Sequence, residues 1–231
     1  MVTKTFSIRE VFSFAWQVFK QRPFFFIALP LIPFILSGLF TLGGSFITNG
    51  LTQLGKQNPD NTAIAGVTSA ILLIEQLISW FISTFLNIGG NGVYLGSVEG
   101  KKMRIADMFS YKFAFFSSLL ASIVVSFVSV FGFLLFIIPG IIWILATQYY
   151  IFTVLTPGTG PWAAIKESMR ITKGVRMKLF LFGIGVGLFN LVGMLLFVVG
   201  IFVTIPISGL ATAYVYITLK KQTATTVDTL L

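Results

Sequence analysis

The chain has 231 residues, of which 56% are hydrophobic and only 10% are charged, and its mean hydropathy is +0.94. A chain of this composition cannot cover its apolar surface with polar groups, which excludes a water-soluble globular protein. It contains no Cys and no His, which excludes thiol and imidazole catalysis, disulfides and the usual zinc sites. The 16 Lys and Arg residues against 7 Asp and Glu residues favour anionic lipid over nucleic acid as a partner.

An amphipathic helix is predicted at the start of the chain, within residues 1–22. Ser7 is its expected N-cap and Glu10 the capping-box partner. Apolar side chains recur at helical spacing along it: Ile8, Val11, Phe12, Ala15, Trp16 and Phe19. We expect this stripe to lie in the headgroup region of a membrane.

Six runs are long and apolar enough to cross a bilayer, which needs about 20 residues. They cover residues 23–48, 64–98, 113–138, 141–156, 179–199 and 201–219 of one transmembrane domain at 23–221, and a tail at 222–231 follows. The expected connections are a loop at 49–61, a turn at Pro139-Gly140 and a turn at Gly200. The second run exceeds one crossing, so we expect it to bend at the glycines of 89–92 or to project into the cytoplasm. No cleavable signal peptide is apparent.

The basic residues test this count. Fifteen of the 16 fall in segments that the six spans place on one side of the membrane, and only Lys56 falls on the other. By the positive-inside rule, both termini are predicted on the cytoplasmic side of the cytoplasmic membrane. Shorter amphipathic segments, around Met108 and Trp162, precede the second and third hairpins. The sequence therefore predicts an all-α, polytopic integral membrane protein of three transmembrane hairpins, each preceded by a cytoplasmic interfacial amphipathic helix.

Two stretches of the chain carry a family resemblance. Ile-Ile-Pro-Gly-Ile-Ile at 137–142 precedes a span, and an A-x-x-x-S-x-x-x-T-x-G pattern follows it. The pattern is formed by Ala164, Ser168, Thr172 and Gly174. These motifs, with Pro206 and Tyr214 in the last span, resemble bacterial and archaeal six-span proteins related to the membrane domain of glycerophosphodiester phosphodiesterases. The resemblance implies a membrane domain without the phosphodiesterase chemistry, which belongs to a separate soluble domain. The chain departs from the family at 156–159, where Thr-Pro-Gly-Thr replaces a frequent acidic residue.

Polar residues within the predicted spans form a candidate intramembrane site. Glu75 is the only ionisable residue inside a span, and such acids often mark ion paths. The other members of this candidate site are Gln76, Asn87, Asn91, Gln148 and Asn190. The alternative is that these groups form hydrogen bonds between helices. If the site transports an ion, Glu75→Gln should abolish a pH-dependent flux in proteoliposomes.

A second candidate site lies where the third amphipathic segment begins. Gly158 and Gly160 open a helix that carries Lys166 and Arg170. Free backbone N–H groups at a helix start, with nearby cations, suit the phosphate of a lipid headgroup. The alternative is an ordinary turn with Pro161 at the first helical position.

Together these patterns predict a non-enzymatic membrane scaffold or lipid-interacting protein. The alternative function is a small transporter or channel that uses Glu75. An intramembrane enzyme is disfavoured, because one buried acid without His or Cys lacks the usual paired acid, base or nucleophile. We expect no catalytic residues, no metal and no cofactor. The expected partners are membrane lipids, which the charge balance predicts to be anionic, and no nucleic acid is expected. A homo-oligomer or a membrane-protein partner stays open.

Overall fold

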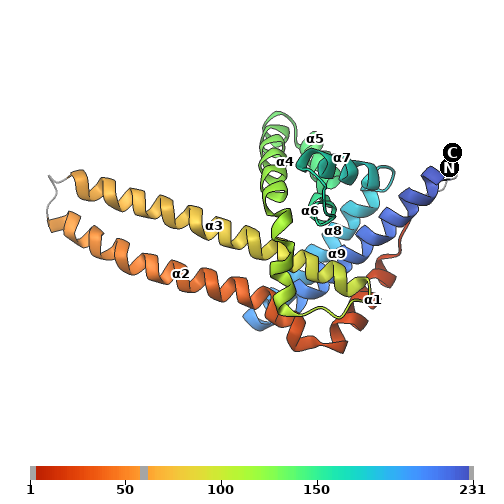
Figure 1. Ribbon diagram of the computed structural model, residues 1–231, viewed down its shortest axis with the longest axis horizontal. Coiled ribbons are helices and arrows are strands. Elements are labelled where there is room, and N and C mark those ends of the chain that lie inside the picture. Colours follow the sequence, from red (N-terminus) through yellow and green to blue (C-terminus); the bar gives the residue numbers. More distant parts are fainter. Residues whose placement is uncertain (1–3, 58–61, 229–231) are drawn as a thin grey trace. The chain divides into compact units, whose positions relative to one another are not determined.

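The computed structural model describes residues 4–57 and 62–228, in which every regular element is helical (Figure 1). The helices are α1 (Ile8–Gln21), α2 (Pro23–Gln57), α3 (Thr62–Val98), η1 (Ile105–Ala114), α4 (Phe115–Leu135), α5 (Ile137–Thr147), α6 (Tyr150–Val154), α7 (Pro161–Thr172), α8 (Arg176–Leu195) and α9 (Phe197–Asp228). Six stretches are long and apolar enough to cross a membrane: Pro23–Gln57, Thr62–Val98, Ile105–Leu135, Ile137–Val154, Arg176–Leu195 and Gly200–Thr225. The prediction of an all-α protein with six membrane-spanning helices is confirmed.

The chain divides into two compact units, one formed by Met1–Pro30 with Ile88–Leu231 and the other by Leu31–Asn87. The second unit consists of most of α2 and α3, whose helices run side by side in opposite directions (Figure 1). The Ser37 and Ser83 hydroxyls lie 3.4 Å apart across it. The 35 residues of α2 extend about 52 Å at 1.5 Å each, well beyond a hydrocarbon core of about 30 Å.

The ends of this hairpin differ from the prediction. The stretch 49–57, expected to belong to a loop, is the last part of α2, and α3 begins at Thr62. Residues 58–61 of the expected loop lie outside the described residues. The helix continues through this stretch because it carries the apolar side chains of Leu51 and Leu54 among its polar ones. A Cβ built on Gly55 would lie 3.5 Å from the Ile64 side chain, which shows that α2 and α3 still pack together here.

The turns of the other two hairpins lie a few residues before the predicted glycines. Extended Phe136, with φ −156° and ψ 130°, separates α4 from α5, so Pro139-Gly140 lies inside α5 rather than at the turn. Leu196 separates α8 from α9, and Gly200 lies inside α9. Both glycines instead let antiparallel helices approach closely, Gly140 against Gly132 and Gly200 against Gly193. The spans therefore end at Leu135 and Leu195 rather than at 138 and 199.

The last helix also differs from its predicted range. α9 runs to Asp228, so the described part of the expected tail at 222–231 is helical. The final span covers Gly200–Thr225, against 201–219 in the prediction. Pro206 lies inside α9.

The glycines near the end of α3 allow η1 to pack closely against this helix without interrupting it. α3 runs without interruption through 89–92, where a bend was one of the two expectations. A Cβ on Gly89 would meet the carbonyl of Met108, and the Tyr111 hydroxyl donates a hydrogen bond to the carbonyl of Gly92 at 3.1 Å. The second amphipathic segment is thus a 3₁₀ helix packed on α3, with Met108 buried.

The fourth span is broken between α5 and α6, and α7 fills the break with two buried hydroxyls. Ser168 accepts a hydrogen bond from the N–H of Tyr149 at 3.1 Å and donates one to the carbonyl of Ala146 at 3.0 Å. Thr172 donates to the same carbonyl at 3.1 Å. Gly174, with φ +90°, then reverses the chain into α8. The Ala-Ser-Thr-Gly pattern is therefore a structural device that satisfies backbone groups left free by the broken span.

The predicted stripe on α1 is divided between protein and surroundings. Ser7 caps the helix as expected and accepts from the N–H of Glu10 at 3.5 Å. Val11, Ala15 and Phe19 are buried in contact with other helices of the first unit, whereas Trp16 is 46% exposed. The expectation that the whole stripe lies in the headgroup region is wrong for Val11, Ala15 and Phe19, because these side chains are buried within the protein. Phe12 meets Phe182 and Phe189 of α8, and Phe14 stacks on Tyr214 of α9.

Candidate functional site

Hydrogen bonds from the N-terminal segment join several of the basic parts of the chain. Lys4 Nζ donates to the carbonyl oxygen of Arg170, at the end of α7, over 2.9 Å. Lys178 Nζ, near the start of α8, donates to the Thr5 hydroxyl. The backbone N–H of Thr5 donates to Gln222 Oε1 at 3.0 Å, and Gln222 Nε2 donates back to the Thr5 carbonyl at 2.8 Å. The ends of α7 and α9 and the start of α8 therefore lie together.

A second contact adds the segment between α3 and η1. Arg22 Nη1 donates to the carbonyl of Met103 at 2.7 Å. The basic residues of these joined segments are called the basic end below: Lys4, Arg9, Lys20, Arg22, Lys101, Lys102, Arg104, Lys112, Lys166, Arg170, Lys173, Arg176, Lys178, Lys220 and Lys221. Their segments are those that the span count places on one side of a membrane, so three-dimensional contact and charge pattern agree.

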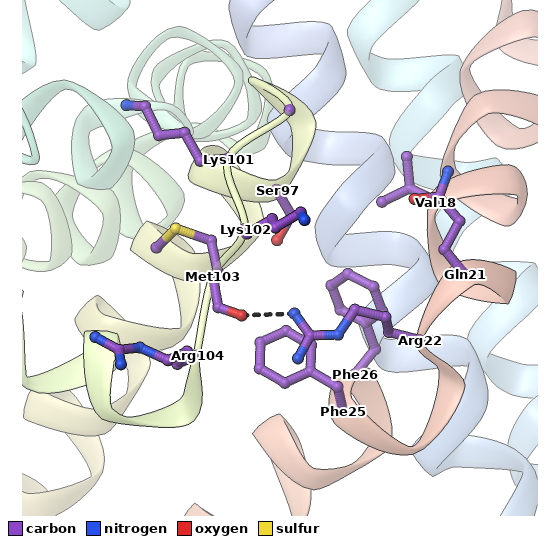
Figure 2. A pocket seen from close by; sticks show the side chains of 11 residues that line it. Val18, Gln21, Arg22, Phe25, Phe26, Ser97, Lys101, Lys102, Met103 and Arg104 are labelled. Carbon is purple, nitrogen blue, oxygen red and sulfur yellow. Dashed lines mark hydrogen bonds between the residues drawn. The ribbon is translucent and has the colours of Figure 1, made fainter.

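A cavity of about 610 Å³ lies within the basic end (Figure 2). The end of α1, the first turn of α2 and the segment that follows α3 form its walls. Four of its lining residues are cationic, namely Arg22, Lys101, Lys102 and Arg104, and none of its lining residues is acidic. In Figure 2, Arg22 reaches towards Met103, with Phe25 and Phe26 beside it. The cavity thus combines positive charge with an aromatic wall.

A left-handed glycine positions the lysines of this cavity. Gly100 has φ +80° just after α3, its N–H donates to the carbonyl of Ser97 at 3.1 Å, and the N–H of Lys101 donates to the carbonyl of Gly96 at 2.9 Å. These bonds end the helix in the manner usual for a C-terminal glycine. The chain then turns, and Lys101 and Lys102 follow as exposed residues beside the cavity.

Acidic neighbours balance some of the basic charges but not others. Arg170 is held by both carboxylate oxygens of Glu167, at 2.7 and 2.8 Å, and this bond raises its pKa. The hydrogen bond that the Lys101 ammonium donates to Glu99, 2.6 Å away, raises the pKa of Lys101. Burial lowers the pKa of Lys4, and the nearby Arg170 charge lowers it further. Arg22 instead has neutral partners, the Met103 carbonyl and the Phe25 ring, whose centroid is 4.4 Å from the guanidinium carbon.

The residues predicted to contact a lipid headgroup near α7 lie at three separate places along it. Gly160 is the N-cap of the helix and Gly158, with φ +81°, lies in the preceding turn. Lys166 lies over the ring of Trp162 at 5.6 Å, and Arg170 is paired with Glu167 two turns from the helix start. Pro161 occupies the first helical position, as in the alternative interpretation.

Three members of the predicted intramembrane site, Glu75, Gln76 and Asn87, lie on α3 in the second unit. Glu75 is half-buried and its carboxylate lies against Gly44 of α2.

The other three members lie at separate positions in the first unit. Asn91 is on α3. Gln148 lies in the break after α5, where its Nε2 donates to the carbonyl of Leu145 at 3.3 Å. Asn190 of α8 accepts a hydrogen bond from the Ser208 hydroxyl of α9 at 3.3 Å. For Asn190 this is the interhelical hydrogen bond of the alternative interpretation.

The cationic cavity was missed from the sequence, although its basic residues were assigned to the correct clusters. Arg22 and Met103 are 81 positions apart, so nothing in local spacing brings them together. A usable signal was the arginine immediately before Pro23, followed by three phenylalanines, at the start of a span. Arginine beside aromatic residues at the start of an apolar run is a pattern typical of a membrane interface.

Comparisons of the chain with protein-family models, with curated proteins and with solved structures give no significant match. The class of the protein therefore follows from its own residues. Six long apolar helices define an all-α, multi-pass integral membrane protein.

Proposed function

We propose that the protein is a non-enzymatic, lipid-interacting scaffold of the cytoplasmic membrane, which engages anionic lipids through its basic end. The observation that carries this proposal is the set of hydrogen bonds that gathers the basic segments, from Lys4 to Gln222, at one end of the first unit. Of the 16 Lys and Arg residues of the chain, 15 lie in those segments, where they suit anionic headgroups. Each cation near such a surface contributes about 1 kcal/mol to the attraction.

Two exposed tryptophans support a membrane-interface position for this end. Trp16 of α1 is 46% exposed and lies under Lys20, with the ammonium 5.8 Å from the ring centroid. Trp162 of α7 is 57% exposed and lies under Lys166 in the same way, at 5.6 Å. Tryptophan beside lysine is typical of the boundary between hydrocarbon and headgroups. By the positive-inside rule, this end and both termini face the cytoplasm.

Bromine-labelled lipids test the proposal, because they quench tryptophan only on contact. The full chain is reconstituted with Trp80 and Trp143 replaced by phenylalanine, so that Trp16 and Trp162 report on the basic end. We expect brominated phosphatidylglycerol to compete about fivefold better than brominated phosphatidylcholine, equivalent to ~1 kcal/mol. The advantage should shrink in 0.5 M salt, a concentration at which screening extends only about 4 Å. Equal quenching by the two lipids at low salt would contradict the proposal.

A further inference from the structure

Two of the four cations that line the cavity lie beside carboxylates, and the other two are available to a ligand. Lys101 is paired with Glu99, and Arg104 lies 4.0 Å from Asp107. Arg22 has no carboxylate partner in the described part of the chain, and Lys102 makes no ion pair there either. One guanidinium N–H of Arg22 is used by the Met103 carbonyl, which leaves further donors of its planar fork for an oxyanion.

Arg22 is held in place by neutral groups. Its hydrogen bond to Met103 and its position over the Phe25 ring restrict the guanidinium while leaving its charge uncompensated. A cation fixed by neutral groups loses little conformational freedom when an anion binds. Phosphate oxygens, which accept parallel N–H bonds, match this arrangement better than a single-point anion does.

The cavity lies beside the ends of two spans. Arg22 immediately precedes Pro23, where the first span begins, and Lys101 and Lys102 follow Val98, where the second span ends. The cavity therefore lies where hydrocarbon gives way to headgroups. Phe25, Phe26 and Val18 add an apolar wall, which suits the glycerol and first acyl carbons of a lipid.

A second cavity, of about 490 Å³, is a weaker candidate. It lies between the end of α9 and the turn before α7, and its lining includes Lys220 and Lys221. Glu99 also lines it and would repel an anion. The first cavity has no such carboxylate among its lining residues.

We propose that the cavity beside Arg22 binds the phosphate-bearing headgroup of one anionic glycerolipid, with the Arg22 guanidinium and the Lys102 ammonium as its phosphate ligands. This inference rests on the proposed function and assigns it a discrete site. The remaining basic residues would then attract anionic lipid without selecting a single molecule.

Native mass spectrometry of the full chain in a delipidating detergent provides the test, with phosphatidic acid, phosphatidylglycerol and phosphatidylcholine titrated separately. We expect one tightly held phosphatidic acid or phosphatidylglycerol molecule per chain. Arg22→Gln and Lys102→Gln should each weaken that binding about tenfold, the loss expected for a charge-assisted hydrogen bond. Lys56→Gln is the matched control: it removes one exposed cation from the end of α2, outside both the cavity and the basic end, and should change binding less than twofold.

The outcomes separate this inference from the proposed function. If all three variants weaken binding equally while the anionic lipids still bind more tightly than phosphatidylcholine, the discrete site is wrong and general attraction to anionic lipid stands. If phosphatidylcholine binds as tightly as the anionic lipids, both proposals fail. Displacement of phosphatidic acid by 10 mM inorganic phosphate would assign the cavity to free phosphate and overturn the lipid assignment. Lys102→Gln guards against misfolding, because the Lys102 side chain makes no ion pair in the described residues, and unfolding temperatures of all variants are compared.

Discussion

Replacing Ser168 with alanine is expected to lower the free energy of unfolding by about 2 kcal/mol. The hydroxyl is fully buried and is the acceptor for the N–H of Tyr149, at the start of α6. Without it that N–H is left buried and unpaired, while the Ala146 carbonyl still accepts from Thr172. Adding Thr172→Val removes this second donor and should raise the loss to about 4 kcal/mol.

Thermal unfolding in detergent, followed by near-ultraviolet circular dichroism, measures this effect. A loss of 2 kcal/mol corresponds to a decrease of about 4–8 °C for a chain of this size. Ser129→Ala is the control, since its hydroxyl donates only to the Val125 carbonyl of its own helix, at 2.7 Å. The control should change stability by less than about 0.5 kcal/mol. Similar decreases for Ser129→Ala and Ser168→Ala would show that the hydroxyl of α7 does not support the broken span.

Gly200→Ala is expected to destabilise the protein by about 2–3 kcal/mol, because α8 and α9 are in backbone contact at this position. A Cβ on Gly200 would overlap the carbonyl oxygen of Gly193, which is backbone and cannot rotate away. The two helices would have to separate, and the contacts along their interface would weaken.

The matched control for this substitution is expected to change the stability in the opposite direction. Gly187 lies on α8, and a Cβ built there meets nothing within 4 Å. Gly187→Ala should therefore stabilise the protein by about 0.5–1 kcal/mol, through reduced freedom of the unfolded chain. Unfolding temperatures of the two variants should lie on opposite sides of the parent value. A Gly200→Ala variant as stable as the parent would place the α8–α9 contact further apart than described here.

The number of spans could be predicted because it depends on two properties of the sequence alone. Run length against bilayer thickness and the location of the lysines and arginines both point to six crossings. The hairpin turns could not be located in the same way. Glycine and proline are typical of turns, but Gly140 and Gly200 serve close helix contact, and single residues, Phe136 and Leu196, make the reversals.

The candidate site was only partly predictable for a related reason. The positive charge of each segment was evident, as was the small-residue and hydroxyl pattern of α7. Their roles depend on contacts between distant positions, such as Arg22 with Met103 and Ser168 with Ala146. The α1 stripe shows the same difficulty, since Phe19 and Trp16 have equal apolar character and only the fold decides that Phe19 is buried.

The pairing of Thr5 with Gln222 has a consequence for biosynthesis. These residues are 217 positions apart, so at a translation rate of about 5–20 residues per second Thr5 emerges roughly 10–40 s before its partner. During that interval the first five spans can enter the bilayer, but the N-terminal segment lacks the last helix it contacts. Closure of the basic end is therefore a late event in synthesis, and a tag fused before Lys4 should delay it more than one inserted between α2 and α3.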